Sequence, residues 1–285
     1  MTVLETIQRS TEFLAKKGVD SPRLQTELLL AHQLKVPRMQ LYLNFERALL
    51  PAELDEFREL IKRRGHREPL QHILGSTCFC GLELAVNRQV LIPRPETEQL
   101  AERGWLFLST LNHQPSTALD FGTGSGCLAI ALAMKCPATR VVALDISKEA
   151  LQLAQLNAGR HGVAERITFV ESGNFARLPN GTQFELIISN PPYIPTAEIG
   201  ALQPEVRDYD PHQALDGGSD GLKFYRQLAA EAGPFLKSTG KIMVELGDGQ
   251  AEFVREIFQC QKWIVEAIEE DYNHRPRMLV ARKPI

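Results

Sequence analysis

The 285-residue sequence has no apolar stretch long enough to cross a membrane, and its first residues, MTVLETIQRS, lack the apolar core of a secretion signal. It also has no internal repeat and no low-complexity tract. These absences predict a cytoplasmic protein that does not associate with membranes. The composition, with 44% hydrophobic and 24% charged residues, is that of a globular chain long enough for one large domain or two moderate ones.

Metal-binding patterns are also missing. The five cysteines form no CxxC pair, and no HxxxH or HExxH spacing occurs. The acidic, glycine-containing segment 208–221 does not have the ligand spacing of an EF-hand. We therefore expect reduced thiols and no metal site, and we interpret segment 208–221 as a shaped loop over the active site.

An excess of positive charge is absent as well. The formal net charge is −3 and the pI is about 6.2. A protein held to DNA or RNA by its overall charge would be basic, although a local basic patch would escape this test. We expect no stable binding of nucleic acid.

Three regions follow one another along the chain. Residues 1–72 show only helical periodicity, with Ser21 as a predicted cap and Pro22 and Pro51 at predicted first helical positions. Residues 73–92 contain short β-like runs typical of a hairpin linker. Residues 93–285 begin with a helix at PRPETEQL and continue as the largest domain.

Strands and helices alternate from residue 117 onward. Apolar runs such as TALDF, RVVALD and FELIIS each precede or follow a helical segment, which predicts an α/β fold with a mostly parallel, doubly wound sheet. The last two strands, WIVEAIEED and RMLVARK, have too few residues between them for a helical crossover. They should pair antiparallel at one edge of the sheet.

A glycine-rich turn follows the first strand and suggests a ligand site. The sequence Gly122-Thr123-Gly124-Ser125-Gly126 permits close approach of a ligand to the backbone, and Asp145 ends the next strand, where a carboxylate can accept both hydroxyls of a ribose. The glycines read GxGxG and not the GxGxxG that seats a pyrophosphate, so S-adenosyl-L-methionine competes with a nicotinamide cofactor. Asp120 is either a further ligand or a helix-cap acid.

The fourth strand ends in Asn190-Pro191-Pro192-Tyr193. The prolines stiffen this segment, the asparagine and proline carbonyls offer two hydrogen-bond acceptors, and Tyr193 offers a flat face. Such a site suits a planar –NH₂ group, whose lone pair is delocalised. Two acceptors would raise electron density on that nitrogen and stabilise the positive charge that develops as it is methylated, without a strong general base.

Three interpretations fit this chemistry. The first is an adenine-N6 methyltransferase of DNA or RNA, which has to flip the base out of its stack and would call for a basic recognition domain. The second is a methyltransferase of a protein amide that uses the helical region for docking. The third is a module that binds cofactor or RNA without transferring a methyl group, which the intact NPPY disfavours.

The chain resembles the glutamine methyltransferases of peptide chain release factors over nearly its whole length. The segments that carry the resemblance are EPLQHILG, VLIPRPETE, DFGTGSG, SNPPYIP and DPHQALDGGSDGL, together with SPRLQTELLLAHQL near the N-terminus. PRPETE is the most specific of them, because NPPY also occurs in nucleic-acid enzymes.

The resemblance implies a class I S-adenosyl-methionine methyltransferase fold with a Rossmann-like sheet, and methylation of the glutamine amide of a Gly-Gly-Gln motif in release factors. We expect a monomer. The resemblance also implies that the residues 122–126, Asp145, Asn174 and Asn190 bind the cofactor, with Phe175 as a further neighbour of the adenine. Residues Asn190, Pro191, Pro192 and Tyr193 would bind the glutamine, and Asn190, Pro191 and Tyr193 would act in catalysis. For PRPETE the sequence leaves two roles open, a part in the site or a structural helix start in which Arg94 ties the linker to the core.

Overall fold

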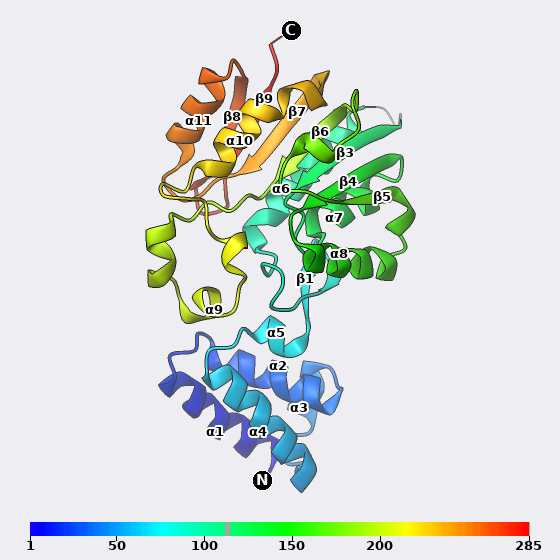
Figure 1. Ribbon diagram of the computed structural model, residues 1–285. Helices are drawn as coiled ribbons and strands as arrows, with labels where there is room; N and C mark the ends of the chain where they lie inside the picture. The colour runs from blue at the N-terminus through cyan, green and yellow to red at the C-terminus, as the bar shows by residue number, and fades with distance from the viewer. Residues whose placement is uncertain (112–114, 285) are drawn as a thin grey trace. The chain divides into compact units, whose positions relative to one another are not determined.

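The computed structural model describes residues 1–111 and 115–284 (Figure 1), and they form two compact units. We call Met1–Ser76 with Leu202–Tyr209 the helical unit, and Thr77–Ala201 with Asp210–Ile285 the sheet unit. These boundaries differ from the predicted ones in two places. Most of the predicted linker, from Thr77 onward, groups with the sheet unit, and the short later segment Leu202–Tyr209 groups with the N-terminal helices. Within the described residues, no helix has the length and apolar character needed to span a membrane.

The helical unit contains α1 (Val3–Lys16), α2 (Pro22–Leu34), α3 (Arg38–Leu43), α4 (Pro51–Gly65), α5 (Leu70–Leu74) and α9 (Pro204–Arg207). Thr2 and Glu5 form a capping box at the start of α1, and prolines occupy the first turns of α2 and α4, as predicted. Ser21 stands at the N-cap position of α2, as predicted, but it does not cap the helix with its side chain. Ser21 has a left-handed φ of 46°, and its side chain makes no capping hydrogen bond.

Helix α9 belongs to the helical unit because its glutamate is held by two arginines of that unit. The Glu205 carboxylate accepts hydrogen bonds from Arg64 at 2.7 Å and from Arg67 at 2.6 Å. Burial alone would raise the pKa of Glu205, but the hydrogen bonds from Arg67 and Arg64 outweigh it and lower this pKa. The hydroxyl group of Tyr209 also donates to the His66 carbonyl. A segment more than a hundred residues away in sequence is thereby part of the helical unit.

The linker forms the predicted hairpin, with β1 (Ser76–Phe79) and β2 (Leu82–Ala85). Its two-residue turn, Cys80-Gly81, has positive φ at both positions, 50° and 77°. That geometry matches the right-handed twist of the strands it joins.

The sheet unit contains the predicted mostly parallel sheet, with seven strands in the order β5-β4-β3-β6-β7-β9-β8. The strands are β3 (Ser116–Phe121), β4 (Thr139–Asp145), β5 (Ile167–Glu171), β6 (Phe184–Ser189), β7 (Leu236–Glu245), β8 (Ile264–Glu270) and β9 (Pro276–Arg282). Strand β9 pairs antiparallel with both β7 and β8, so the prediction of an antiparallel pair at one edge is confirmed.

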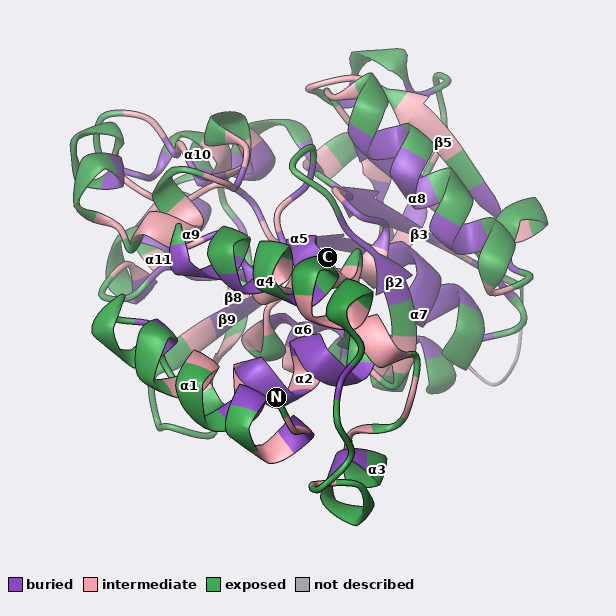
Figure 2. Ribbon diagram, turned by 90° about the horizontal axis from the view of Figure 1, so that it is seen from below, coloured by how far each residue is buried: buried purple, intermediate pink, exposed green. Residues whose placement is uncertain are grey.

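Helices cover both faces of this sheet (Figure 1). They are α6 (Pro95–Ser109), α7 (Cys127–Lys135), α8 (Lys148–Arg160), α10 (Lys223–Glu231) and α11 (Ala251–Cys260), with 3₁₀ turns η1 (Ala164–Arg166), η2 (Phe175–Arg177), η3 (Thr196–Ala201), η4 (His212–Ala214) and η5 (Gly233–Phe235). Successive strand residues enter different cores: Ala118 packs with α6 and α7, and Leu119 with α10 and α11. In Figure 2, helix α8 accordingly has a buried and an exposed side.

The strand order fixes where a ligand site can form. Strand β3 lies beside β4 on one side and β6 on the other, and the chain proceeds to β5 on the first side and to β7 on the second. The order therefore reverses between β3 and β6, and in open α/β sheets the crevice at such a switch point, beyond the carboxyl ends of the strands, is where ligands bind.

Candidate functional site

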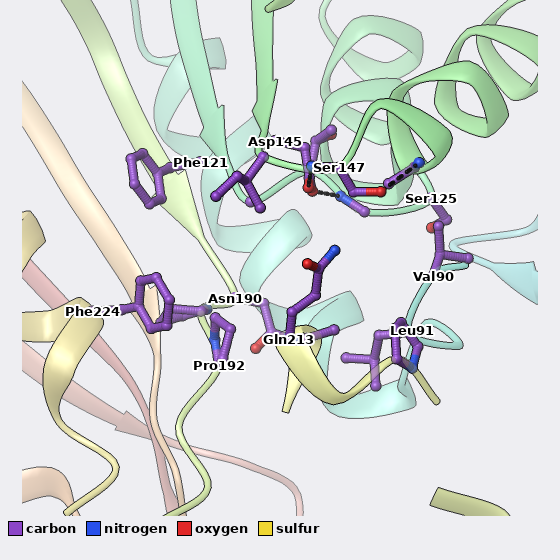
Figure 3. A pocket seen from close by; sticks show the side chains of 18 of the residues that line it. Val90, Leu91, Phe121, Ser125, Asp145, Ser147, Asn190, Pro192, Gln213 and Phe224 are labelled. Carbon is purple, nitrogen blue, oxygen red and sulfur yellow. Dashed lines mark hydrogen bonds between the residues drawn. The ribbon is translucent and has the colours of Figure 1, made fainter. Parts of the chain in front are cut away.

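A cavity of about 430 Å³ lies at this switch point (Figure 3). It is lined from the carboxyl ends of β3, β4 and β6, from the linker, and from the segment around η4 and α10. The lining residues used below are Leu91, Arg94, Thr97, Gly122, Thr123, Gly124, Ser125, Asp145, Ile146, Gly173, Asn190, Pro191, Pro192, Gln213 and Phe224. The volume is within the range of small-molecule sites.

The three glycines after β3 have two different roles. Gly122 and Gly124 have φ of 76° and 54°, and a Cβ added at either would meet no atom within 4 Å. Their backbone is therefore open to a ligand. Gly126 is not among the lining residues; a Cβ there would lie 3.0 Å from the Ala154 Cβ, so this glycine lets α7 and α8 pack closely.

Asp145 is held in place by the turn that it faces. One carboxylate oxygen accepts the Gly124 N–H at 2.8 Å and the other accepts the Ser147 N–H at 2.9 Å. Burial raises the pKa of Asp145, and these backbone N–H groups partly offset the rise. Each oxygen retains a lone pair, so the carboxylate can accept two further hydrogen bonds from ligand hydroxyls.

Asp120 acts inside the turn. Its Oδ2 accepts from the Thr123 hydroxyl at 2.6 Å and from the Ala129 N–H at 3.1 Å, and burial raises its pKa to about 7. It does not line the cavity. Of the two roles open from the sequence, these contacts favour the structural one, in which Asp120 fixes the turn and the start of α7.

A second polar brace joins the turn to the linker. The buried side chain of Asn157 on α8 donates to the carbonyls of Ser125 and Ala85, and it accepts the Ala85 N–H at 2.8 Å. This role cannot be predicted from sequence, because an asparagine in a helix usually lies on the surface.

The Asn-Pro-Pro-Tyr segment divides between the cavity and the core. Asn190, Pro191 and Pro192 line the cavity, but Tyr193 does not. The Tyr193 ring packs against Gly247, where an added Cβ would lie 2.9 Å from it, and burial raises the pKa of Tyr193 to about 12. The stacking role expected of Tyr193 therefore stays a prediction without a contact at the cavity wall.

The two residues predicted to border the adenine, Asn174 and Phe175, are not among the residues that line the cavity. Gly173 lines the cavity, while the side chain of Asn174 accepts the Ala176 N–H as the cap of η2. The Phe175 ring is buried and stacks on Phe121 at 5.2 Å between centroids. These two predicted residues shape the loop from behind the cavity wall.

The PRPETE segment connects three parts of the sheet unit. Pro95 starts α6, Arg94 forms an ion pair with the buried Asp210 at 2.7 Å, and the Glu98 carboxylate accepts the Cys80 N–H at 2.8 Å in the hairpin turn. Its threonine, Thr97, accepts a hydrogen bond from the Asn190 side-chain amide at 3.0 Å. Both roles left open from the sequence are thus present in one segment.

Sequence reasoning missed several apolar and polar wall residues. Ile146, directly after Asp145, is 65% exposed although it is large and apolar. Leu91 of the linker and Phe224 of α10 line the same cavity. Figure 3 shows the Gln213 side chain pointing into the cavity from the predicted loop 208–221. An apolar residue after a strand-end acid was a signal for Ile146, but the others depend on tertiary contacts.

Two protein families and a solved structure match this chain. The PrmC N-terminal domain family matches residues 5–75, and the methyltransferase small domain family matches residues 99–202. A crystal structure of a methyltransferase from Pyrococcus furiosus shares the fold, with a TM-score of 0.52 and 22% identity over 72% of this chain and 91% of that one.

Similarity to two sequence relatives extends over nearly the whole chain. The release factor glutamine methyltransferase of Geobacter sulfurreducens is 49% identical over 260 residues, which cover 90% of this chain and 88% of the relative. That of Chlorobaculum tepidum is 44% identical over 286 residues, which cover 98% and 96%. At this identity and coverage, the chain belongs to the release factor glutamine methyltransferase family.

Proposed function

We propose that this protein transfers a methyl group from S-adenosyl-L-methionine to the side-chain amide nitrogen of the glutamine in the Gly-Gly-Gln motif of peptide chain release factors. One observation carries the proposal: a single cavity contains an exposed glycine turn, a strand-end aspartate and the Asn-Pro-Pro segment. The names of the relatives support the amide substrate over an adenine base.

The residues of the cavity fit this cofactor. Asp145 would accept the two ribose hydroxyls, the open backbone at Gly122 and Gly124 would lie against the amino-acid tail, and the exposed Ile146 would pack against the adenine. Gly126 and Asn174 would contribute indirectly, by fixing the loops. S-adenosyl-L-methionine supplies a methyl group on a positively charged sulfur, which leaves as a neutral thioether.

The Asn-Pro-Pro segment would act on the other reactant. The Asn190 side-chain oxygen and the Pro191 carbonyl would each accept one hydrogen of the glutamine –NH₂, which aligns the nitrogen and favours the positive charge that develops on it. The new N–C bond would form as the bond from the methyl group to sulfur breaks, and the positively charged nitrogen would then release one proton to solvent. Stabilisation of the developing charge, with positioning for in-line attack, is the catalytic contribution of these residues.

The helical unit would recognise the rest of the release factor. A three-residue motif offers little surface, whereas a specific protein complex normally buries about 1,200 Å² or more. Helix α3 exposes two large apolar side chains, with Met39 67% and Leu43 84% accessible. We place the docking contact for the release factor there.

The proposal is tested with purified enzyme, methyl-labelled cofactor and a recombinant release factor, with the modified residue located by peptide mass spectrometry. We expect one label, on the glutamine of the motif, and none when that glutamine is replaced by alanine. An adenine-containing oligonucleotide serves as the competing substrate. Label in the oligonucleotide, or at another residue of the release factor, would refute the assignment.

A further inference from the structure

A chain of two hydrogen bonds runs from the cavity wall into the core. The Asn190 side-chain nitrogen donates to the Thr97 hydroxyl oxygen at 3.0 Å, and that hydroxyl donates to the Glu245 carboxylate at 2.7 Å. Thr97 and Glu245 are each 2% exposed, so water does not compete for these bonds. Asn190 directly follows β6, Thr97 is in α6 and Glu245 ends β7, so the three residues are far apart in sequence.

The direction of the chain follows from the chemistry of its end. An ionised carboxylate can only accept hydrogen bonds, so the Thr97 hydroxyl must donate its one hydrogen to Glu245. The Thr97 oxygen then remains as an acceptor, and only the –NH₂ end of the Asn190 amide can face it. The amide oxygen is thereby left for the cavity, where Asn190 forms part of the wall.

We propose that Thr97 and Glu245 are positioning residues that set the orientation of the Asn190 amide. The inference rests on the proposed function, in which the Asn190 oxygen accepts a hydrogen of the substrate amide. A flipped Asn190 would present its own hydrogens to the –NH₂ of the substrate, donor against donor. The flip therefore abolishes the acceptor and makes the site repulsive to its substrate.

The surroundings of Glu245 make this orientation sensitive to pH. Its backbone carbonyl accepts the Tyr225 hydroxyl at 2.9 Å, which fixes the end of β7. Burial raises the pKa of Glu245 to about 7; the hydrogen bond from Thr97 and the positive charges of Arg277 and Arg94 lower it, and Glu96 raises it. Tyr193 and Tyr225 also lie near this carboxylate; both are neutral near pH 7, since a tyrosine ordinarily titrates near 10 and burial raises both pKa values further.

Protonation would reverse the chain. A neutral Glu245 can donate to the Thr97 oxygen, which frees the Thr97 hydrogen to bond the oxygen of a flipped Asn190. Methyl transfer should accordingly rise with pH through a value near 7, since the ionised form of Glu245 holds the productive orientation.

The first test is a matched pair at Thr97. Thr97→Val keeps the shape and removes the hydroxyl, and Thr97→Ser keeps the hydroxyl. We expect the valine variant to lose about tenfold in kcat, the worth of one hydrogen bond, with KM for the release factor and the affinity for S-adenosyl-L-methionine unchanged. The serine variant should retain kcat. Equal kcat in the two variants, or a change in melting temperature alone, would overturn the inference.

The second test is Glu245→Gln, which can still accept from Thr97 but does not titrate. The rise of kcat near pH 7 should disappear in this variant, and its persistence would show that another group causes it.

A third readout needs no substrate and separates this inference from the proposed function. In the full-length protein labelled with ¹⁵N-asparagine, the side-chain signal that is missing in Asn190→Ala should titrate near pH 7 in the wild type and not in Glu245→Gln. A signal that ignores pH in the wild type would refute the inference even if release factors are methylated.

Discussion

A half-buried carboxylate of the helical unit and two buried carboxylates of the sheet unit are held in opposite ways. In the helical unit, Glu205 is paired with the cations of Arg64 and Arg67, and its pKa is lowered. In the sheet unit, the hydrogen bonds to the side chains of Asp120 and Glu245 come from hydroxyl or backbone N–H groups, and burial raises both pKa values to about 7.

This difference shows what each unit is built to do. Ion pairs give fixed attachment, because their charge states do not change near neutral pH. Buried carboxylates whose pKa lies near 7 cost stability when ionised, which is tolerated where the group orients a functional residue or turn. The comparison predicts that changes in the sheet unit alter chemistry with every substrate, whereas changes in the helical unit alter recognition of the large substrate.

The largest effect is expected at Asn190. Asn190→Ala removes one of the two acceptors for the substrate –NH₂ group, so kcat should fall by about 10²–10³, the usual cost of losing one preorganised polar group. The loss should be the same with a whole release factor and with a short Gly-Gly-Gln peptide, because the residue belongs to the chemistry and not to docking. Steady-state rates with both substrates measure this, and near-normal turnover would rule out the amide-acceptor mechanism.

The next effect concerns the cofactor. Asp145→Ala should weaken binding of S-adenosyl-L-methionine by about 10–100-fold, the range expected for hydrogen bonds to a charged acceptor. Asp145→Asn keeps one acceptor oxygen and should lie between this variant and the wild type. Calorimetry gives the affinities and circular dichroism checks the fold. Unchanged affinity in the alanine variant would remove Asp145 from the cofactor site.

A smaller effect is expected on the helical unit. Replacing Met39 and Leu43 together by serine should raise KM for a whole release factor about fivefold, which corresponds to about 1 kcal/mol of lost contact. The rate with the short peptide should not change. Phe253→Ser removes a comparably exposed apolar side chain, 59% accessible, from the sheet unit and serves as the control.

If the double variant at Met39 and Leu43 changed the kinetics with the whole release factor and with the short peptide equally, the docking role of these two residues would be contradicted. Deletion of the first 80 residues is a less clean test, because Leu202–Tyr209 would lose the helices with which it forms one unit.

The smallest expected effect is on the pH dependence of stability, which should have opposite signs for Asp120 in the sheet unit and Glu205 in the helical unit. The raised pKa of Asp120 means that its contribution to the free energy of unfolding is fully present below the ordinary pKa of 3.8 and is lost as pH rises through about 7. Asp120→Asn should therefore reduce the fall in melting temperature between pH 5 and pH 8, by roughly 2–4 °C for each kcal/mol involved.

Glu205 should show the reverse dependence. Its lowered pKa gives a contribution that is present above the ordinary value of 4.5 and is lost as pH falls through the folded-state pKa. Glu205→Gln should thus lower the melting temperature at pH 8, and this effect should shrink as the pH falls below 4.5. Thermal unfolding followed by circular dichroism measures both variants, and slopes of the same sign would remove the contrast between the units.

The sheet and much of the site could be predicted from sequence because their signals are local. Alternating apolar strands and helices fix the sheet, and Gly122, Gly124 and Asp145 stand at strand ends where any such sheet places ligands. The same reasoning missed Thr97 and Glu245. A threonine in a first helical turn and an acid at the end of a strand have no sequence feature that reveals a hydrogen bond between them.

Other differences have the same origin. The excursion of α9 into the helical unit depends on ion pairs between residues more than 130 positions apart. Tyr193 was expected at the cavity because its neighbours are there, but a single residue after Pro192 the chain has turned its side chain toward Gly247. Pattern reasoning locates strand ends well, and it does not give the direction of each side chain beyond them.

The membership of α9 in the helical unit limits how this protein can be recombined. Residues 1–76 look like a detachable module in the linear sequence, yet their unit is completed by residues 202–209 from the middle of the other one. A chimera that exchanges only the N-terminal segment with a relative would set a foreign surface against Glu205 in place of Arg64 and Arg67. In domain-shuffling experiments the two segments should therefore be exchanged together. In evolution, substitutions in one segment should be accompanied by substitutions in the other.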